Sequence, residues 1–344
     1  MNDTRAQLQI EQYAETPEDP TLYSVPMSVD HTSLRGGTHI FSWGRGDLGQ
    51  LGTGLDSSQP QPVLVQAVEA KDVSHVAASV FNSAFITADT ELWTTGSNDS
   101  CQLGHKGHET QLYPCRVQAL DAHGVCQVAC GQQHMLAVAD GGALCAWGAA
   151  DLGQLGLGEV GVEQPQPRFL KNTKEHHFVR VAAGAGHSLA LTSSGQVWSF
   201  GQGSFGTLGQ GDSFFCNVPR PMLSLAALGI VQVACGESHN AALTVHGEVF
   251  TWGRGKYGAL GLGAFDNSSW PQHVTALQEP ACQVACGGQH TLVISKQGRV
   301  FAWGQGSVGQ TGLGRKETVN VPTCIQALEG QHVTSQRGCS TAWP

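Results

Sequence analysis

The stretch "WGRGDLGQLG" (Trp43–Gly52) contains G-x-G-x-x-G, the glycine spacing of a dinucleotide-binding turn. Such a turn holds a cofactor only where a strand leads into it and a helix leads out of it. Here it is followed by "QLGTGLDSSQPQPVLV" (50–65), which has no 3.6-residue apolar period and contains helix-breaking glycines and prolines. The same glycine spacing returns from Gly201, Gly253 and Gly304. Because a recurring turn belongs to a repeated structural unit, we expect no cofactor.

The repeat is centred on a pair whose second residue is glycine and whose first is aromatic in all but one copy. Its glycines are 51 to 53 residues apart. The six pairs are Trp43-Gly44, Thr95-Gly96, Trp147-Gly148, Phe200-Gly201, Trp252-Gly253 and Trp303-Gly304. Alternating stretches such as "EVFTW" (248–252) lead into the pair and predict a strand. In four repeats a histidine stands thirteen residues earlier, between two further apolar runs: His134, His187, His239 and His290.

A proline-containing stretch after the glycine turn supplies a fourth strand, so each repeat has about four short strands. Units of this length bury their apolar faces by stacking radially around an axis. The sequence therefore predicts an all-β protein, a β-propeller of four-stranded blades with six full repeats, a partial one at the C-terminus, and no helix longer than about three turns.

Composition narrows the classes of function. The 344 residues include 45 glycines and 11 cysteines, carry only 13% charged residues and have a net charge of −9. This acidity disfavours direct nucleic-acid binding. With no long apolar segment and no secretion signal, we expect no membrane insertion, a cytoplasmic or nuclear location and reduced cysteines.

The motifs "VACGxxHTxxL", "G-x-V-[FW]-x-W-G" and "G-x-x-G-Q-L-G", over about residues 38 to 335, resemble the repeat of the regulator of chromosome condensation family. The resemblance implies a seven-bladed propeller. Here a seventh repeat begins at "HVTSQRGCSTAW" (332–343), with Cys339 in the histidine position, and the chain stops. Either the chain is truncated or this segment closes the ring against the first repeat. We divide the chain into a flexible, acidic segment over 1–36 and a single propeller domain over 37–344.

Two C-x3-C-x3-H sets match the ligand types of zinc: Cys126, Cys130 and His134, and Cys282, Cys286 and His290. Equivalent positions in other repeats hold serine, valine or alanine, which is typical of a packed strand. We therefore predict no metal site and four largely buried thiols at Cys126, Cys130, Cys282 and Cys286. The recurring histidine is interpreted as a hydrogen-bonding structural residue, and without a nucleophile–base pairing we expect no enzyme activity.

The residues that differ inside the conserved glycine turn are candidates for binding a partner. The position of Asp47 reads Asp47, Asp99, Asp151, Ser204, Lys256 and Ser307 along the repeats. The next position adds apolar and aromatic residues. The candidate partner-binding residues are Arg45, Asp47, Asp99, Asp151, Phe205, Lys256 and Tyr257. The alternative, that these turns merely tolerate polar residues, stays open.

The family resemblance implies two functions to weigh. Its founding member exchanges nucleotide on the GTPase Ran with a wedge-like insertion and binds chromatin with a basic tail. Here the repeat spacing leaves no room for an insertion, and residues 1–36 carry six acidic against two basic residues. A plant photoreceptor resembling the family uses a G-W-R-H-T element, which "GQQHM" and "GGQHT" do not reproduce. We therefore predict a non-enzymatic scaffold for a protein partner, with nucleotide exchange on another small GTPase as the alternative.

Overall fold

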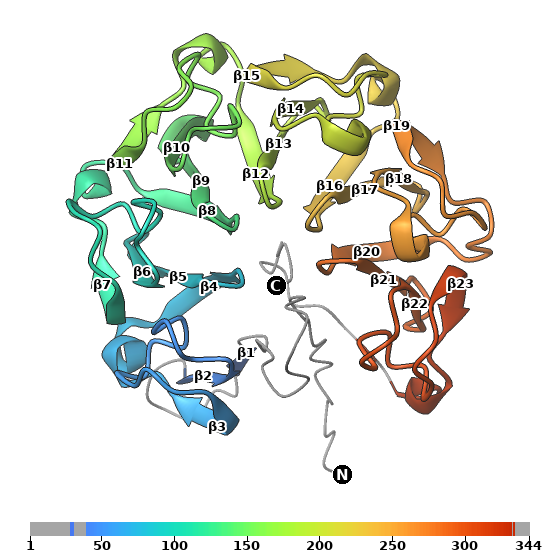
Figure 1. Ribbon diagram of the computed structural model, residues 1–344, viewed down its shortest axis with the longest axis horizontal. Helices are drawn as coiled ribbons and strands as arrows, with labels where there is room; N and C mark the ends of the chain where they lie inside the picture. Colours follow the sequence, from blue (N-terminus) through green and yellow to red (C-terminus); the bar gives the residue numbers. More distant parts are fainter. Residues whose placement is uncertain (1–27, 31–38, 332, 334–344) are drawn as a thin grey trace.

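The chain folds as an all-β propeller, as the repeat predicts (Figure 1). The computed structural model describes residues 28–30, 39–331 and 333. Within these residues the longest helix, η1 (Gln66–Lys71), has six residues, and no helix is long and apolar enough to cross a membrane. The architecture is therefore carried by strands and their connections.

The strands are short and regular, mostly of five or six residues. They are β1 (Ser28–Asp30), β2 (His39–Gly44), β3 (Gln59–Leu64), β4 (Val73–Ala78), β5 (Asn82–Thr87), β6 (Leu92–Gly96), β7 (Gln111–Arg116), β8 (Val125–Cys130), β9 (His134–Ala139), β10 (Ala143–Gly148), β11 (Gln164–Phe169), β12 (Phe178–Ala183), β13 (His187–Thr192), β14 (Val197–Gly201), β15 (Cys216–Pro221), β16 (Ile230–Cys235), β17 (His239–Thr244), β18 (Val249–Gly253), β19 (Ser268–His273), β20 (Ala281–Cys286), β21 (His290–Ser295), β22 (Val300–Gly304) and β23 (Val319–Cys324). Besides η1, the 3-10 helices are η2 (Gln118–Leu120), η3 (Asp140–Gly142), η4 (Lys171–Thr173), η5 (Ser204–Gly206), η6 (Leu223–Leu225), η7 (Lys256–Gly258) and η8 (Gln326–Leu328).

These strands form six antiparallel sheets, which we number along the chain. The first sheet is β1–β3, the second β4–β7, the third β8–β11, the fourth β12–β15, the fifth β16–β19 and the sixth β20–β23. In the four-stranded sheets the first strand is innermost and the fourth lies at the rim of the ring (Figure 1). Five repeats thus have the expected four strands, arranged radially in chain order.

The first sheet differs, with three strands among the described residues. Its strand β1 pairs with β2, so the sheet begins N-terminal of residue 37, where we placed the domain boundary. The rest of the 1–36 segment lies outside the described residues. So does Cys339, and with it most of the seventh repeat and the question of ring closure.

The strands of a sheet differ in burial, and their amino-acid composition differs accordingly. The second strand of each four-stranded sheet, for example β9, is buried along its whole length because sheets pack on both of its faces. The fourth strands lie at the edge, where proline is tolerated because one side of the strand needs no hydrogen-bond donor. Prolines accordingly occur in β7, β11 and β15.

Successive sheets are tied together by the aromatic residue of the repeated pair. The fully buried Trp147 donates its indole N–H to the carbonyl of Gln102 in the preceding repeat, at 2.9 Å. Trp252 does the same to Thr207 at 3.0 Å. A buried indole needs such an acceptor, so the tryptophan both fills the space between sheets and anchors the neighbouring loop.

The repeated histidine makes the reverse connection, to the following sheet. His187 Nε2 lies 2.7 Å from Asn240 Oδ1, and His239 Nε2 lies 2.9 Å from Thr291 Oγ1. Both imidazoles are buried, and burial lowers their pKa, to about 4 for His187 and about 3 for His239. Neutral histidines therefore bridge one sheet to the next.

Candidate protein-binding face

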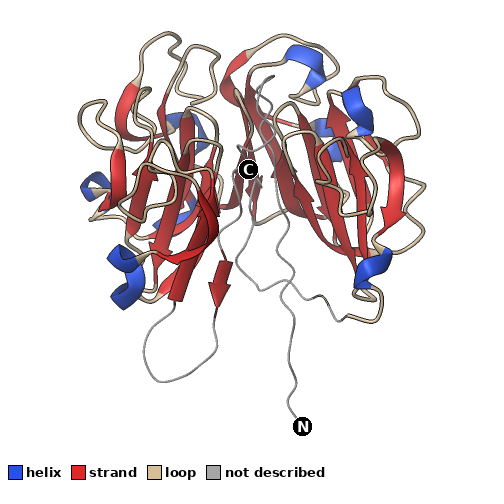
Figure 2. Ribbon diagram, turned by 60° about the horizontal axis from the view of Figure 1, so that its bottom comes forward, coloured by secondary structure: helices blue, strands red, loops and turns tan. Residues whose placement is uncertain are grey.

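Strand direction places two sets of connections on one face of the ring. In an antiparallel sheet the turn after the first strand and the loop after the third strand leave from the same edge. The loops after the third strand of the four-stranded sheets cover residues 97–110, 149–163, 202–215, 254–267 and 305–318, and the equivalent loop of the first sheet, between β2 and β3, covers 45–58. The turns after the first strand cover 79–81, 131–133, 184–186, 236–238 and 287–289. We call this side the loop face; Figure 2 shows connections gathered at the two ends of the strands.

All seven predicted partner-binding residues lie in these loops. Asp47, Asp99, Asp151, Phe205 and Lys256 are exposed, whereas Arg45 and Tyr257 are half-buried. None is buried between sheets. They are spread over five sheets, so they form a surface and do not converge on one cavity.

At the first sheet, the predicted acidic residue is neutralised by its own loop. Arg45 Nε donates to Asp47 Oδ1 at 2.7 Å, and Arg45 Nη2 donates to Asp47 Oδ2 at 2.8 Å. This two-pronged pairing lowers the pKa of the Asp47 carboxyl. The acidic side of the face therefore rests mainly on Asp99 and Asp151.

Between the fourth and fifth sheets, four residues come together that the sequence places in two separate repeats. The Arg254 guanidinium lies 4.7 Å from the centre of the Phe205 ring, and Lys256 Nζ lies 4.3 Å from the centre of the Tyr257 ring. Such contacts hold a cation against an aromatic face. We call Phe205, Arg254, Lys256 and Tyr257 the basic-aromatic group.

The two aromatic members have an unusual backbone. Phe205 has φ 62° and Tyr257 has φ 64°, in the left-handed region that bulky residues rarely adopt. A conformation of this kind costs on the order of 1 kcal/mol or more and is found preferentially at binding sites. Phe205, in η5, is 43% exposed.

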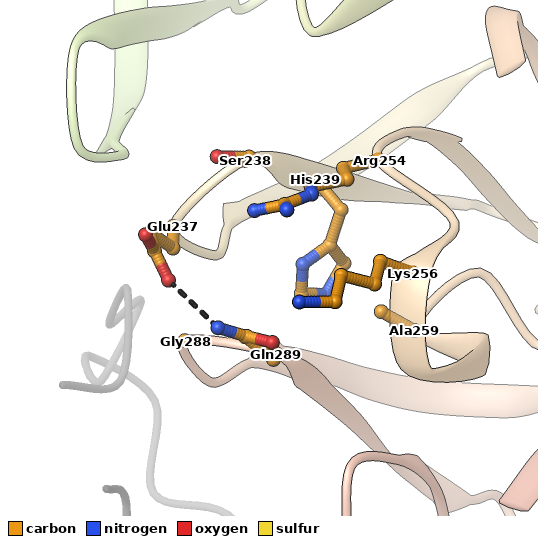
Figure 3. Close-up of a pocket in the computed structure, with 8 residues that line it drawn as sticks. All are labelled: Glu237, Ser238, His239, Arg254, Lys256, Ala259, Gly288 and Gln289. Atoms are coloured by element: carbon orange, nitrogen blue, oxygen red, sulfur yellow. Dashed lines mark hydrogen bonds between the residues drawn. The ribbon is translucent and has the colours of Figure 1, made fainter. Parts of the chain in front are cut away.

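A pocket adjoins this group at the boundary of the fifth and sixth sheets (Figure 3). Its lining residues are Glu237, Ser238, His239, Arg254, Lys256, Ala259, Gly288 and Gln289. Gln289 Nε2 donates to Glu237 Oε2 at 3.2 Å and closes one side of the pocket. The pocket thus presents two cations opposite a carboxylate.

Arg254 and Glu237 were missed by the sequence prediction. Arg254 occupies the position of Arg45 in its repeat, so the alignment that selected Arg45 also offered it. Glu237 stands between the glycine and histidine of "GESH", where the letters also change between repeats. Variation inside that first turn was the available signal.

The predicted burial of the four cysteines is wrong for two of them. Cys130 and Cys286 are buried, but Cys126 and Cys282 are exposed. Both exposed residues are second in the innermost strand, and Ser74 in the same position is exposed too. This position falls in a β-bulge, where the innermost strand has an extra residue that pairs with no residue of the second strand.

The ligand atoms of neither C-x3-C-x3-H set come together among the described residues. Cys126 Sγ lies 3.7 Å from Asp140 Oδ1, while His134 Nε2 lies 2.9 Å from Ser188 Oγ in the next sheet. The histidine's ring nitrogen is therefore used between sheets and not toward Cys126.

Comparison with known proteins identifies the family of this propeller. The RCC1-like domain model matches residues 39–343. This chain belongs to the RCC1-like domain family. The resemblance inferred from the repeat motifs is thereby confirmed.

Relatives in this family differ greatly in length. The ultraviolet-B receptor UVR8 of Arabidopsis thaliana is 33% identical over 322 residues, which are 91% of this chain and 73% of the receptor. Human E3 ubiquitin-protein ligase HERC2 is 35% identical over 301 residues, 86% of this chain but only 6% of the ligase. The matched region is thus about three quarters of one relative and a small part of another.

Solved structures share the fold. Human WBSCR16 superposes with a TM-score of 0.74 at 27% identity, covering 85% of this chain and 79% of that protein. Prp20p of Saccharomyces cerevisiae has a TM-score of 0.73 at 22% identity, covering 85% and 75%. The second similarity is one of fold alone.

Proposed function

We propose that this RCC1-like propeller is a non-enzymatic scaffold that binds a protein partner through the loop face. The observation that carries the proposal is the basic-aromatic group, in which Phe205 and Tyr257 are held in left-handed backbone conformations with cations against their rings. Aromatic residues and arginine dominate the energetics of protein interfaces. A rigid ring that presents them at one site, without further chemistry, fits a docking role.

The charge distribution supports a polarised contact. Asp99 and Asp151 lie on the second and third sheets, and Arg254 and Lys256 lie on the fifth. Opposite charges on one face orient an approaching partner and raise its association rate. The partner we expect has a basic patch facing the two aspartates and an acidic or apolar patch facing the basic-aromatic group.

Kinetic measurements on charge variants test this proposal. A partner is first isolated by affinity purification with the full chain, and its association is then followed in real time. Lysine replacement of Asp47, Asp99 and Asp151 together should slow association, with a smaller effect at high salt because screening already weakens the attraction. Unchanged association and dissociation for every isolated partner, both in this triple variant and in Phe205→Ala, would contradict the proposal.

Nucleotide exchange on a small GTPase is the second candidate. It is supported by the family resemblance and by the fold shared with Prp20p, whose structure was described together with its binding to Gsp1p and histones. Release of fluorescent GDP from a panel of small GTPases distinguishes the two functions. A scaffold leaves every release rate unchanged, whereas an exchange factor accelerates one of them.

A further inference from the structure

One repeat has a cysteine where the five others have glycine. Cys101 is equivalent to Gly49, Gly153, Gly206, Gly258 and Gly309, all with positive φ. Cys101 also has a positive φ, 56°, and is only 3% exposed. At this position a side chain points to the next repeat. In the fourth repeat, for example, a Cβ added to the equivalent Gly206 would lie 2.4 Å from Ser269 Cα of the fifth. Cys101 therefore projects toward the third sheet.

Two further metal-binding side chains meet this thiol. His108 follows Cys101 in the loop of the second sheet, and Glu163 ends the loop of the third. Cys101 Sγ lies 3.6 Å from His108 Nδ1, 3.8 Å from His108 Nε2 and 3.7 Å from Glu163 Oε2. Among the described residues this is the single group of three such side chains whose donor atoms all lie within 4.8 Å of one another.

These separations suit a tetrahedral zinc ion. With Zn–S near 2.3 Å and Zn–N or Zn–O near 2.1 Å, a tetrahedral site separates the sulfur from its nitrogen and oxygen neighbours by about 3.6 Å. The observed separations from Cys101 Sγ are within a few tenths of an ångström of that value. One thiolate, one imidazole and one carboxylate form a donor set that zinc accepts.

One ring nitrogen of His108 has a backbone partner. His108 Nδ1 lies 3.0 Å from the backbone carbonyl oxygen of Asp99 and can donate its proton there. That bond leaves Nε2 without a proton, so its lone pair is available to a metal ion. Both ring nitrogens lie near the thiol, Nδ1 at 3.6 Å and Nε2 at 3.8 Å from Cys101 Sγ. A histidine that binds metal through one nitrogen usually donates from the other to a carbonyl or carboxylate in this way. The loop is held in place by Asn98 Nδ2, which donates to Gly107 O at 2.8 Å.

We propose that Cys101, His108 and Glu163 form a zinc site that joins the loops of the second and third sheets. The side chains of His108 and Glu163 are 61% and 41% exposed, so water completes the coordination and the ion is accessible from solvent. The site departs from the metal-free protein expected from the sequence. Its ligands come from two repeats and do not recur, which is why motif spacing did not reveal them.

Zinc titration of the reduced, chelator-stripped full chain tests the site. Zn²⁺ is added in competition with a chromophoric chelator, and we expect one equivalent to bind. Cys101→Gly restores the glycine of the other repeats and should fold normally. It should weaken binding by more than the ~10–100-fold that loss of an outer-shell partner costs. Glu163→Gln, an exposed change, should also weaken it.

Cobalt supplies a readout of ligand identity. Co²⁺ in place of Zn²⁺ should give a thiolate-to-metal charge-transfer absorption that disappears in Cys101→Gly. The matched control is Cys126→Ser, which removes an exposed thiol outside the cluster and should leave the absorption intact. The proposal is overturned if the wild-type chain binds no zinc, or if Cys101→Gly binds it with unchanged affinity and retains the cobalt absorption.

Discussion

Two positions recur in the repeats, one buried and one in the exposed turn. The buried position holds histidine in four repeats, whereas the residue in the turn changes its charge. His134, His187 and His239 each contact a polar side chain of the next sheet. The turn position instead changes from aspartate to serine to lysine. A buried polar group left without a partner costs about 1–3 kcal/mol, whereas an exposed substitution changes stability by about 0.5 kcal/mol or less. Burial constrains the histidine, and exposure leaves the turn available for binding.

The second repeat shows what happens when the buried position changes. Asn82 replaces the histidine, and the equivalent contact position of the next sheet holds Met135. Neither side-chain polar atom of Asn82 has a hydrogen-bond partner among the described residues, although the residue is fully buried. The contrast between Asn82 and His187 can therefore be measured within one molecule.

The largest expected effect is a loss of stability in mild acid. Burial lowers the pKa of His134 and His239 to about 3 and of His187 and His290 to about 4, from 6.5. Between pH 6.5 and 4 these histidines bind protons in the unfolded chain but not in the native state. The stability that the neutral histidines contribute is therefore complete above pH 6.5 and declines as the pH falls toward 4.

Four such groups predict a loss of about 5 kcal/mol per pH unit in this window, about 1.4 kcal/mol from each. Urea denaturation at pH 7, 6 and 5 measures the slope. In His187→Gln the slope should fall by about 1.4 kcal/mol per pH unit. Equal stability at pH 7 and pH 5 would show that these histidines are protonated without cost.

The next effect separates the two buried positions directly. His187→Ala leaves a cavity and removes the hydrogen bond to Asn240 Oδ1, so we expect a cost of about 3 kcal/mol in the free energy of unfolding. Asn82→Ala removes an amide without a described partner and should cost less than about 1 kcal/mol. Urea unfolding at pH 7 compares them, and similar losses would argue against the role given to the inter-sheet hydrogen bond.

A smaller effect is expected at the glycine that Cys101 replaces. Gly206→Ala should destabilise the protein by about 1–2 kcal/mol, because φ is 78° and the new Cβ would meet Ser269 Cα. Cys101→Gly should be neutral or slightly stabilising in metal-free protein, since it relieves a left-handed cysteine. Thermal unfolding without zinc gives both values. A large loss in Cys101→Gly would assign the cysteine a packing role.

The smallest effect on stability, and a clear one on binding, is expected on the loop face. Phe205→Ala and Tyr257→Ala should each change the free energy of unfolding by about 0.5 kcal/mol or less. Each should speed dissociation of the partner about tenfold, corresponding to about 1.4 kcal/mol. Leu223→Ala is the control, because Leu223 is 79% exposed in η6, on the opposite face. If all three changes alter the dissociation rate equally, the partner does not bind through the loop face.

The repeat allowed much of the fold to be predicted. The spacing of the Trp-Gly pairs identified strands, turns and the propeller because each repeat carries the same local signals. The same alignment placed Asp99, Phe205 and Lys256 together in the loops of one face. It did not distinguish exposed Cys126 from buried Cys130, because both lie in the same apolar strand and only the strand pairing shows that Cys126 falls in a β-bulge whereas Cys130 pairs with Met135.

By itself, the sequence determined the order of strands within a repeat and the glycines that turn the chain, since these depend on residues close together along it. Only the tertiary structure decided which residues of different repeats meet. Arg254 reaches Phe205, and Cys101 reaches Glu163, across the boundary between sheets. Such contacts depend on how neighbouring sheets are rotated and spaced around the ring, and a period read along the chain contains no information on that geometry.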